Sequence, residues 1–181
     1  MAIYVMSDGA VEVRAPHGAS RSFIEEFVEK KKNWIGNTQE EMRRRRAEQS
    51  TIVLNAKQVK EAKAKAKALL SGKCASFAGI MGVDYRSVKI SSAKSRWGSC
   101  TSRGDLNFTY RLIFAEEELV DYIVVHELAH RREMNHSPRF WEVVERVLPD
   151  YRQRRAGLRA FQRQVAIVEK GEGCEEQQSL F

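Results

Sequence analysis

The chain has 181 residues, of which 43% are hydrophobic and 30% are charged, and its formal net charge at pH 7 is +7. This composition is typical of a globular protein with a sizeable buried core. No apolar run approaches the ~20 residues that span a bilayer, and the N-terminus lacks the basic and apolar stretches of a signal peptide. We therefore expect a cytoplasmic protein with no membrane partner.

The start of the chain predicts a β-hairpin followed by a helix. Residues 3–5 and 11–13 alternate like strands and flank turn-forming residues at 7–9. A helix is expected over residues 20–34, because a serine that can cap it stands at its start and apolar residues line one face. We expect Gly36 and Asn37 to break this helix.

Helices are expected to fill roughly residues 38–82, with interruptions near Ser50 and Gly72. The segment 29–73 is strongly basic, with 13 Lys and Arg against 5 Asp and Glu. Its two clusters are Arg43–Arg46 and the series Lys57, Lys60, Lys63, Lys65 and Lys67. Such a patch can bind nucleic acid or a nucleotide, with a solvated helical face as the alternative, and its few aromatics do not suggest base stacking.

A second β region is predicted after these helices. Strands are expected at residues 87–91, 96–101 and 106–114, with a turn at 102–105 between the second and the third. A helix begins directly afterwards, near Glu116. The order of elements therefore changes from helical to β and back to helical.

The three cysteines predict no cross-link. Cys74, Cys100 and Cys174 are far apart and form no C-x-x-C pair, so neither a disulfide framework nor a cysteine-based zinc site is expected. We expect Cys100 to be a thiol without a catalytic role. The alternative is that Cys100 acts as a nucleophile with a histidine partner. A metal site explains the histidines more directly.

Three of the four histidines fall within residues 126–136, which begin with an H-E-x-x-H motif. On a helix His126 and His130 share one face, one turn apart, with Cβ atoms about 5–6 Å from each other. Two imidazoles placed so can bind one cation, and Glu127 lies beside it, where a base for water belongs. The alternative is a solvated helix with incidental histidines. The fourth, His17, is expected in a loop.

His136 needs a reversal of the chain to reach the same metal ion, and the residues after it predict one. Ser137 is a good N-cap, and Pro138 suits the first position of a helix. We expect this helix to run to about Leu148. It should pack under the site with its apolar residues Phe140, Trp141, Val144 and Val147. A surface histidine in a turn is the alternative for His136.

The predicted chain order is three strands, an H-E-x-x-H helix and a turn with a third histidine. This order is the layout of a zincin. The specific stretches are Lys94–Cys100, Leu106–Phe108, Arg111–Leu112, Asp121–His130, Asn135–Pro138 and Phe140–Trp141. They resemble the YgjP-like metallopeptidase family, which is related to the SprT-like zinc metallopeptidases. The resemblance implies one zinc ion per chain, with His126, His130 and His136 as ligands and Glu127 as base.

We therefore expect an α+β, zincin-like metallopeptidase fold in which a small antiparallel or mixed sheet packs on the H-E-x-x-H helix. A single domain is expected over residues 1–170, mostly helical and basic at 18–82, with the catalytic core at 86–165. A closing helix from about 151 to 169 and a flexible tail at 171–181 complete the chain.

The expected function is hydrolysis of a peptide or protein by a metal-activated water. The β segment around Trp97 can pair with an extended peptide. The alternative for Trp97 is a position in the core. Arg111 or Tyr151 can stabilise an oxyanion. Two other functions stay open. One is a metal-dependent phosphoanhydride (nucleotide) hydrolase, which the basic segment favours. The other is a nucleic-acid-associated zinc protein without catalysis, against which an open three-histidine site argues.

Overall fold

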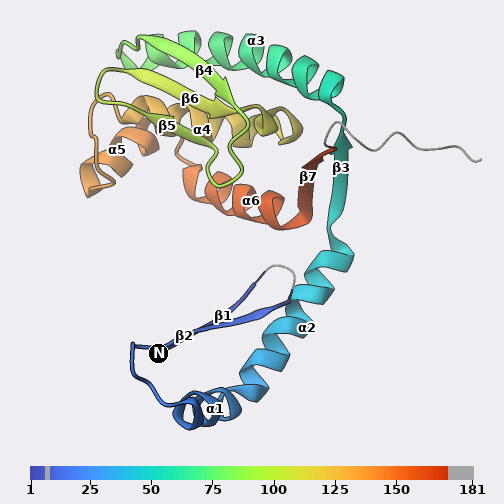
Figure 1. Ribbon diagram of the computed structural model, residues 1–181. Coiled ribbons are helices and arrows are strands. Elements are labelled where there is room, and N and C mark those ends of the chain that lie inside the picture. The colour runs from blue at the N-terminus through green and yellow to red at the C-terminus, as the bar shows by residue number, and fades with distance from the viewer. Residues whose placement is uncertain (7–8, 171–181) are drawn as a thin grey trace, which may run out of the picture. The chain divides into compact units, whose positions relative to one another are not determined.

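The computed structural model describes residues 1–6 and 9–170 (Figure 1). The predicted tail at 171–181 lies outside the described residues. Residues 1–50 form one unit and the chain from residue 51 onward forms a second, and each is described by itself. Among the described helices, none is both long and apolar enough to cross a membrane.

The first unit begins with the predicted hairpin. β1 (Ala2–Val5) pairs with β2 (Val11–Arg14) in antiparallel orientation. Helix α1 (Arg21–Lys30) follows, and its first turn is capped because the Ser20 hydroxyl accepts a hydrogen bond from Phe23 N at 3.3 Å. The serine signal thus placed the start of this helix correctly.

Helix α2 (Lys32–Glu48) corrects the sequence prediction. The expected break at Gly36 and Asn37 is wrong, because α2 passes through both residues. The chain turns instead at Lys31, between α1 and α2. A glycine inside a helix costs only about 1 kcal/mol relative to alanine, so a helix of 17 residues can absorb it.

The longest described helix of the second unit is α3 (Ala56–Met81). The Asn55 and Gln58 side chains each accept a hydrogen bond from the other's backbone N–H at 2.9 Å, which is a capping box. The helix ends at Gly82, whose φ of 59° is left-handed. The predicted interruption near Gly72 is wrong, since α3 continues through it. Buried side chains recur every three or four residues: Val59, Ala62, Ala66, Leu70, Cys74, Ala78 and Met81.

A three-stranded mixed sheet lies next to α3. β4 (Ser87–Ser91) runs parallel to β6 (Asp105–Thr109), and β5 (Gly98–Cys100) pairs with β6 on its other side in antiparallel orientation. The predicted strand at 87–91 has the bounds of β4, whereas β5 is shorter than the predicted 96–101. Among the described strands β5 has β6 as its one neighbour, so it is an edge strand.

The third predicted strand, 106–114, is correct only in its first half. β6 ends at Thr109, and the chain continues as a 3-10 helix, η1 (Tyr110–Phe114). The Thr109 hydroxyl accepts a hydrogen bond from Arg111 N at 3.4 Å, which favours a turn over further extension. Helix α4 (Glu117–Ala129) then starts after a two-residue gap.

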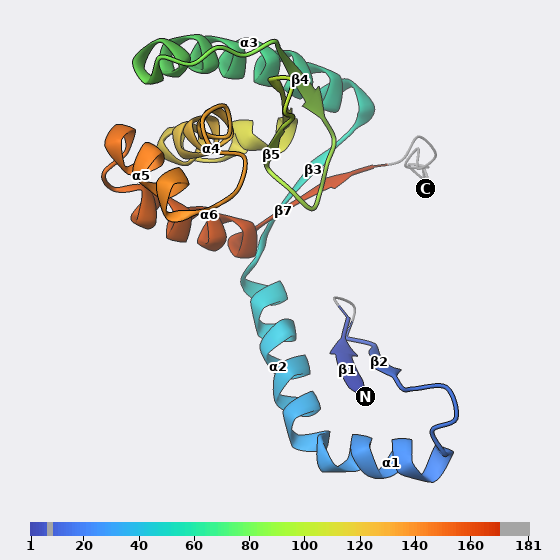
Figure 2. The same cartoon turned by 90° about the vertical axis from the view of Figure 1, so that its left-hand side faces the viewer.

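Helix α4, which carries the H-E-x-x-H motif, lies between α3 and α6 (Tyr151–Gln164) in both views (Figure 1, Figure 2). It is buried on most of its surface: Val124, Val125 and Leu128 have no exposed area. They belong to one core that also contains Phe108 of the sheet. This burial fixes where the histidines of α4 point. The expected α+β fold class, with a small mixed sheet and the H-E-x-x-H helix in one core, is thereby confirmed.

Two strands were absent from the sequence prediction. The closing helix was expected to reach residue 169, but α6 ends at Gln164 and β7 (Val165–Glu169) follows. β7 pairs with β3 (Ser50–Leu54), which replaces the helix interruption expected there. Both segments are rich in β-branched residues, which favour strands. The pairing joins parts of the chain more than 100 residues apart, so no local pattern announces it.

Candidate metal centre

The last turn of α4 supplies the first two histidines of the cluster. His126 lies within the helix and is half-buried, while His130 is the C-cap residue and is buried. The four-residue spacing predicted that both would share a face, and the structure places their ring centroids 5.2 Å apart. The core packing of α4 therefore orients both rings.

The chain reversal after α4 brings in the third histidine. The Asn135 side chain accepts a hydrogen bond from Ser137 N at 3.1 Å, which closes the turn around His136. Ser137 in turn caps α5 (Pro138–Val147) by accepting a hydrogen bond from Phe140 N at 3.4 Å. The predicted helix start at Ser137 and Pro138 is confirmed, and it anchors the turn.

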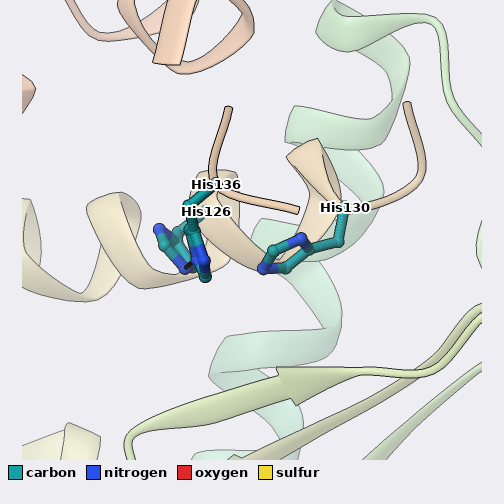
Figure 3. A group of neighbouring side chains, drawn as sticks. All are labelled: His126, His130 and His136. Carbon is teal, nitrogen blue, oxygen red and sulfur yellow. Dashed lines mark hydrogen bonds between the residues drawn. The ribbon is translucent and has the colours of Figure 1, made fainter. Parts of the chain in front are cut away.

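The three imidazoles converge on one point (Figure 3). One nitrogen of each ring lies within 4.8 Å of the corresponding nitrogens of the other two. The Nε2 atoms of His126 and His136 are 3.0 Å apart. Three nitrogen atoms at this spacing can hold a single metal ion. Among the described residues, the group of side chains that could bind a metal consists of His126, His130 and His136.

Phe140 forms the floor of the cluster. Its ring centroid lies 4.9 Å from that of His126 and 4.7 Å from those of His130 and His136, and the residue has no exposed area. Trp141 follows it and stacks on His136 at 5.8 Å. The prediction that this helix packs under the site is thus confirmed, and the aromatic floor keeps water from one side of the rings.

The tautomer of His130 and the neutral form of two of the rings suit metal binding. Nδ1 of His130 lies 3.1 Å from the carbonyl oxygen of Glu133, so Nδ1–H donates there and Nε2 is left for a ligand. Burial lowers the pKa of His126 to about 3, with a smaller effect of the neighbouring histidine charges. Burial also lowers the pKa of His130. Both rings are therefore neutral at pH 7, which is the form that binds a metal ion.

The carboxylate of Glu127 lies against the edge strand rather than in the cluster. Glu127 is 5% exposed. An ideal Cβ on Gly98, the first residue of β5, would stand 2.6 Å from its Oε1 atom and 2.7 Å from its Cγ atom. The missing side chain of Gly98 therefore makes the space that Glu127 fills. Burial raises the pKa of Glu127 to about 8, against an opposing effect of the Arg96 charge.

A cavity of about 260 Å³ opens beside this carboxylate. Its walls come from three elements. Gly98 of the edge strand and Trp97 just before it contribute one wall, and Tyr122, Ile123, His126 and Glu127 contribute from α4. Arg155, Leu158, Arg159 and Gln162 contribute from α6. The cavity thus joins the histidine cluster and the buried carboxylate to one open space.

The candidate substrate-binding residues fall in different places. Trp97 lines the cavity and packs on Phe161 at 5.8 Å. Tyr151 is buried and stacks on Trp141 at 5.4 Å, behind the histidines. Arg111 is 7% exposed and donates hydrogen bonds to β7. Of the three, Trp97 is the one that the structure brings to the cavity.

Arg111 is engaged by the C-terminal strand. Its Nη2 atom lies 3.0 Å from Oε1 of Glu169, and its Nη1 atom donates to the carbonyl oxygen of Ile167. The hydroxyl of Tyr110 donates to the same Glu169 carboxylate at 2.9 Å. These contacts hold β7 against η1.

Sequence reasoning overlooked two features of the site. A glycine inside a strand marks a close approach of another group, so Gly98 carried a usable signal. Arg155 and Arg159 stand four residues apart and therefore share one helix face. Neither pattern could be linked to the H-E-x-x-H motif, because these residues lie far from the motif along the chain and approach it only in the folded protein.

Comparisons with known proteins give two similar solved structures and one matching family. The chain is similar to the metallopeptidase zymogen abylysin of Pyrococcus abyssi at 25% identity, with 54% of this chain and 99% of that chain covered and a TM-score of 0.47. It is also similar to the metallopeptidase zymogen jannalysin of Methanocaldococcus jannaschii at 18% identity, covering 51% and 94%, with a TM-score of 0.44. No curated protein matches the sequence. The family described as "YgjP-like, metallopeptidase domain" matches residues 1–60 and 53–161. The chain therefore belongs to the YgjP-like metallopeptidase family.

Proposed function

We propose that the chain is a zinc-dependent metallopeptidase that hydrolyses peptide bonds, with one zinc ion bound by His126, His130 and His136 and with Glu127 as the catalytic base. The observation that carries the proposal is the convergence of three imidazole nitrogens within 4.8 Å, next to a buried carboxylate. Membership of a metallopeptidase family supports peptides or proteins as substrates.

The donor set fits zinc. Zinc prefers imidazole nitrogen and a tetrahedral arrangement, and catalytic sites use three protein ligands and leave a fourth position open. The three histidines provide three ligands, and no fourth His, Cys, Asp or Glu joins the group among the described residues. A zinc ion held there supplies a Lewis acid that polarises the substrate carbonyl and activates water.

The surroundings of Glu127 support a role in proton transfer. Its carboxylate is buried between α4 and Gly98 and opens on the cavity that His126 also lines. Burial favours the protonated carboxyl, and the charge of a zinc ion bound nearby would favour the ionised form. The ionised carboxylate would take a proton from the attacking water and deliver it to the nitrogen of the leaving amine. Because its surroundings restrict the rotamer of Glu127, the carboxylate needs little reorganisation when a proton is transferred.

The edge strand supports the proposed mode of substrate binding. β5 pairs with β6 on one side, and Trp97, immediately before β5, lines the cavity. An extended peptide can add to such an edge through backbone hydrogen bonds. We assign to Trp97 the role of an apolar wall for the side chain that enters the cavity.

Digestion of an unfolded protein tests the proposal. The zinc-loaded protein should produce fragments with new N-termini, chelation should stop this, and about one equivalent of zinc should restore it. No fragments from any of several unfolded proteins, with zinc fully bound, would contradict peptidase activity.

A second candidate is hydrolysis of a phosphoanhydride such as that of a nucleotide. Arg155 and Arg159 favour it, because guanidinium groups lining a cavity beside an activated water can bind phosphate. Nucleoside triphosphates belong in the same experiment. Release of phosphate or pyrophosphate without peptide cleavage would favour this function over the first.

Nucleic acid is a proposed partner of the basic segment at 29–73. On α3 the side chains of Lys57, Lys60 and Lys65 are exposed, which supports an electrostatic contact with phosphates. Such binding should weaken as salt rises. Binding that is independent of salt would count against it.

A further inference from the structure

We propose that the cavity beside Glu127 is a specificity pocket for an acidic side chain of the substrate, an Asp or Glu close to the cleaved bond, and that Arg155 and Arg159 recognise its carboxylate. This inference rests on the proposed peptidase function. It adds the class of substrate, which neither the family nor the three-histidine cluster defines.

Both arginines project from one face of α6 toward the site. They are four residues apart, one helical turn, and both line the same cavity as His126 and Glu127. Arg155 lies over the ring of Trp141, with its Cζ atom 5.0 Å from the ring centroid. Trp141 itself stacks on His136, so Arg155 is held next to the histidine cluster.

The two guanidinium groups are free to bind a ligand. Both side chains are exposed, and neither has a hydrogen bond or an acidic partner among the described residues. Their neighbours on the same helix differ: Arg152 pairs with Glu145 at 3.3 Å and Arg154 with Asp150 at 2.9 Å. The arginines that face the cavity are thus the unpaired ones.

The size and walls of the cavity fit one side chain. Its volume of about 260 Å³ is below the roughly 300–1,000 Å³ of pockets that enclose a drug-sized ligand. Trp97, Ile123 and Leu158 give it apolar walls. A short aliphatic stem that ends in a carboxylate matches a cavity that apolar walls and guanidinium groups line together, whereas a whole nucleoside triphosphate would not be enclosed.

The exposed charges that line the cavity are positive. Among the described residues that line the cavity, Glu127 is the one acidic residue, and it is 5% exposed, while both arginines are exposed. A planar guanidinium binds a carboxylate through two parallel N–H···O hydrogen bonds. An incoming lysine or arginine side chain would meet like charges instead. The cavity therefore discriminates by charge.

A set of fluorogenic peptides that differ at one position next to the cleaved bond tests the inference. The Glu peptide should be cleaved with a kcat/KM about tenfold above that of its Gln counterpart, and the Lys peptide should be the poorest. Arg159→Gln should reduce this preference, and Arg159→Glu should reverse it in favour of Lys. Arg152→Gln, on the same helix but outside the cavity, should keep the wild-type pattern.

The outcomes separate this inference from the proposed function. Equal cleavage of all peptides, or a Glu preference unchanged in Arg159→Glu, would overturn it. If no peptide is cleaved, the proposed function fails, and binding of the same peptides measured by fluorescence anisotropy decides the inference. Tighter binding of the Glu peptide that Arg159→Glu abolishes would support it. Competition by inorganic triphosphate, without any preference among peptides, would assign the arginines to phosphate and overturn it.

Discussion

The carboxylate of Glu127 occupies the space that a side chain on Gly98 would fill, with Oε1 2.6 Å from the position of an ideal Cβ. The position of the proposed base therefore depends on the absence of a side chain at residue 98 of the edge strand. A Cβ cannot approach a carboxylate so closely, so any larger residue at position 98 must displace Glu127 or shift the strand.

Gly98→Ala should lower kcat for peptide hydrolysis by about 100-fold, which is the cost of misplacing a catalytic group by about 1 Å. Zinc content should stay near one per chain, because the three ligands lie on other elements. Gly72→Ala is the control, since a Cβ there meets no atom within 4 Å. Full activity of Gly98→Ala would show that the position of Glu127 does not depend on this glycine.

His130→Ala should lower the affinity for zinc by more than about 100-fold, since loss of a ligand exceeds the 10- to 100-fold cost of losing a second-shell partner. Its imidazole is one of three that converge within 4.8 Å. Metal analysis after dialysis measures this. His17→Ala, at an exposed position in the first unit, should retain zinc. Retention of zinc by His130→Ala would remove this residue from the ligand set.

Lys73 of α3 ties this helix to α4, which carries the H-E-x-x-H motif. Its Nζ atom lies 2.5 Å from Oδ1 of Asp121 and 2.7 Å from Oε1 of Glu117, both on α4. Burial alone would lower the pKa of Lys73, but these hydrogen bonds and charges outweigh it and leave the pKa above its usual value. Lys73→Met should therefore reduce the free energy of unfolding at pH 7 by about 1–3 kcal/mol.

The pH dependence of that difference follows from the raised pKa. Lys73 stays charged in the folded protein to a higher pH than in the unfolded chain, so its contribution is complete below about pH 10. The contribution is lost as the pH rises through the raised value. Urea unfolding at several pH values checks this, with the exposed Lys57→Met on the same helix as control. A stability difference that is zero at pH 7 would contradict the account.

Arg111→Met should weaken the attachment of β7 without affecting the metal. It removes the hydrogen bonds to Ile167 and Glu169, and we expect a loss of about 1–3 kcal/mol in the free energy of unfolding. Zinc content should be unchanged. Unchanged stability together with a large fall in kcat would instead return Arg111 to the oxyanion role that the sequence suggested.

The local features of the fold were predictable from sequence. The hairpin, the strand at 87–91 and the caps at Ser20 and Ser137 each depend on a few neighbouring residues, and each was predicted correctly. Gly36 and Gly72 misled, because a glycine weakens a helix by only about 1 kcal/mol. Tertiary packing can outweigh a penalty of that size.

The chemistry of the site was readable from spacing, but its surroundings were not. The i, i+4 pair and the capped turn after His136 brought the metal-binding group together in the prediction. The fit of Glu127 against Gly98 and the arginines of α6 arise from contacts between distant segments. The pairing of β3 with β7 is also a contact between distant segments. Periodicity along the chain does not predict such contacts.

The central claim is that a three-histidine metal centre acts with Glu127 as its base, and Glu127→Gln tests it most directly. The amide keeps the size of the side chain but cannot accept the proton from water. We expect about one zinc ion per chain, as in the wild type, and a loss of peptide hydrolysis of at least about 100-fold. Undiminished hydrolysis by a fully zinc-loaded Glu127→Gln protein would contradict the claim.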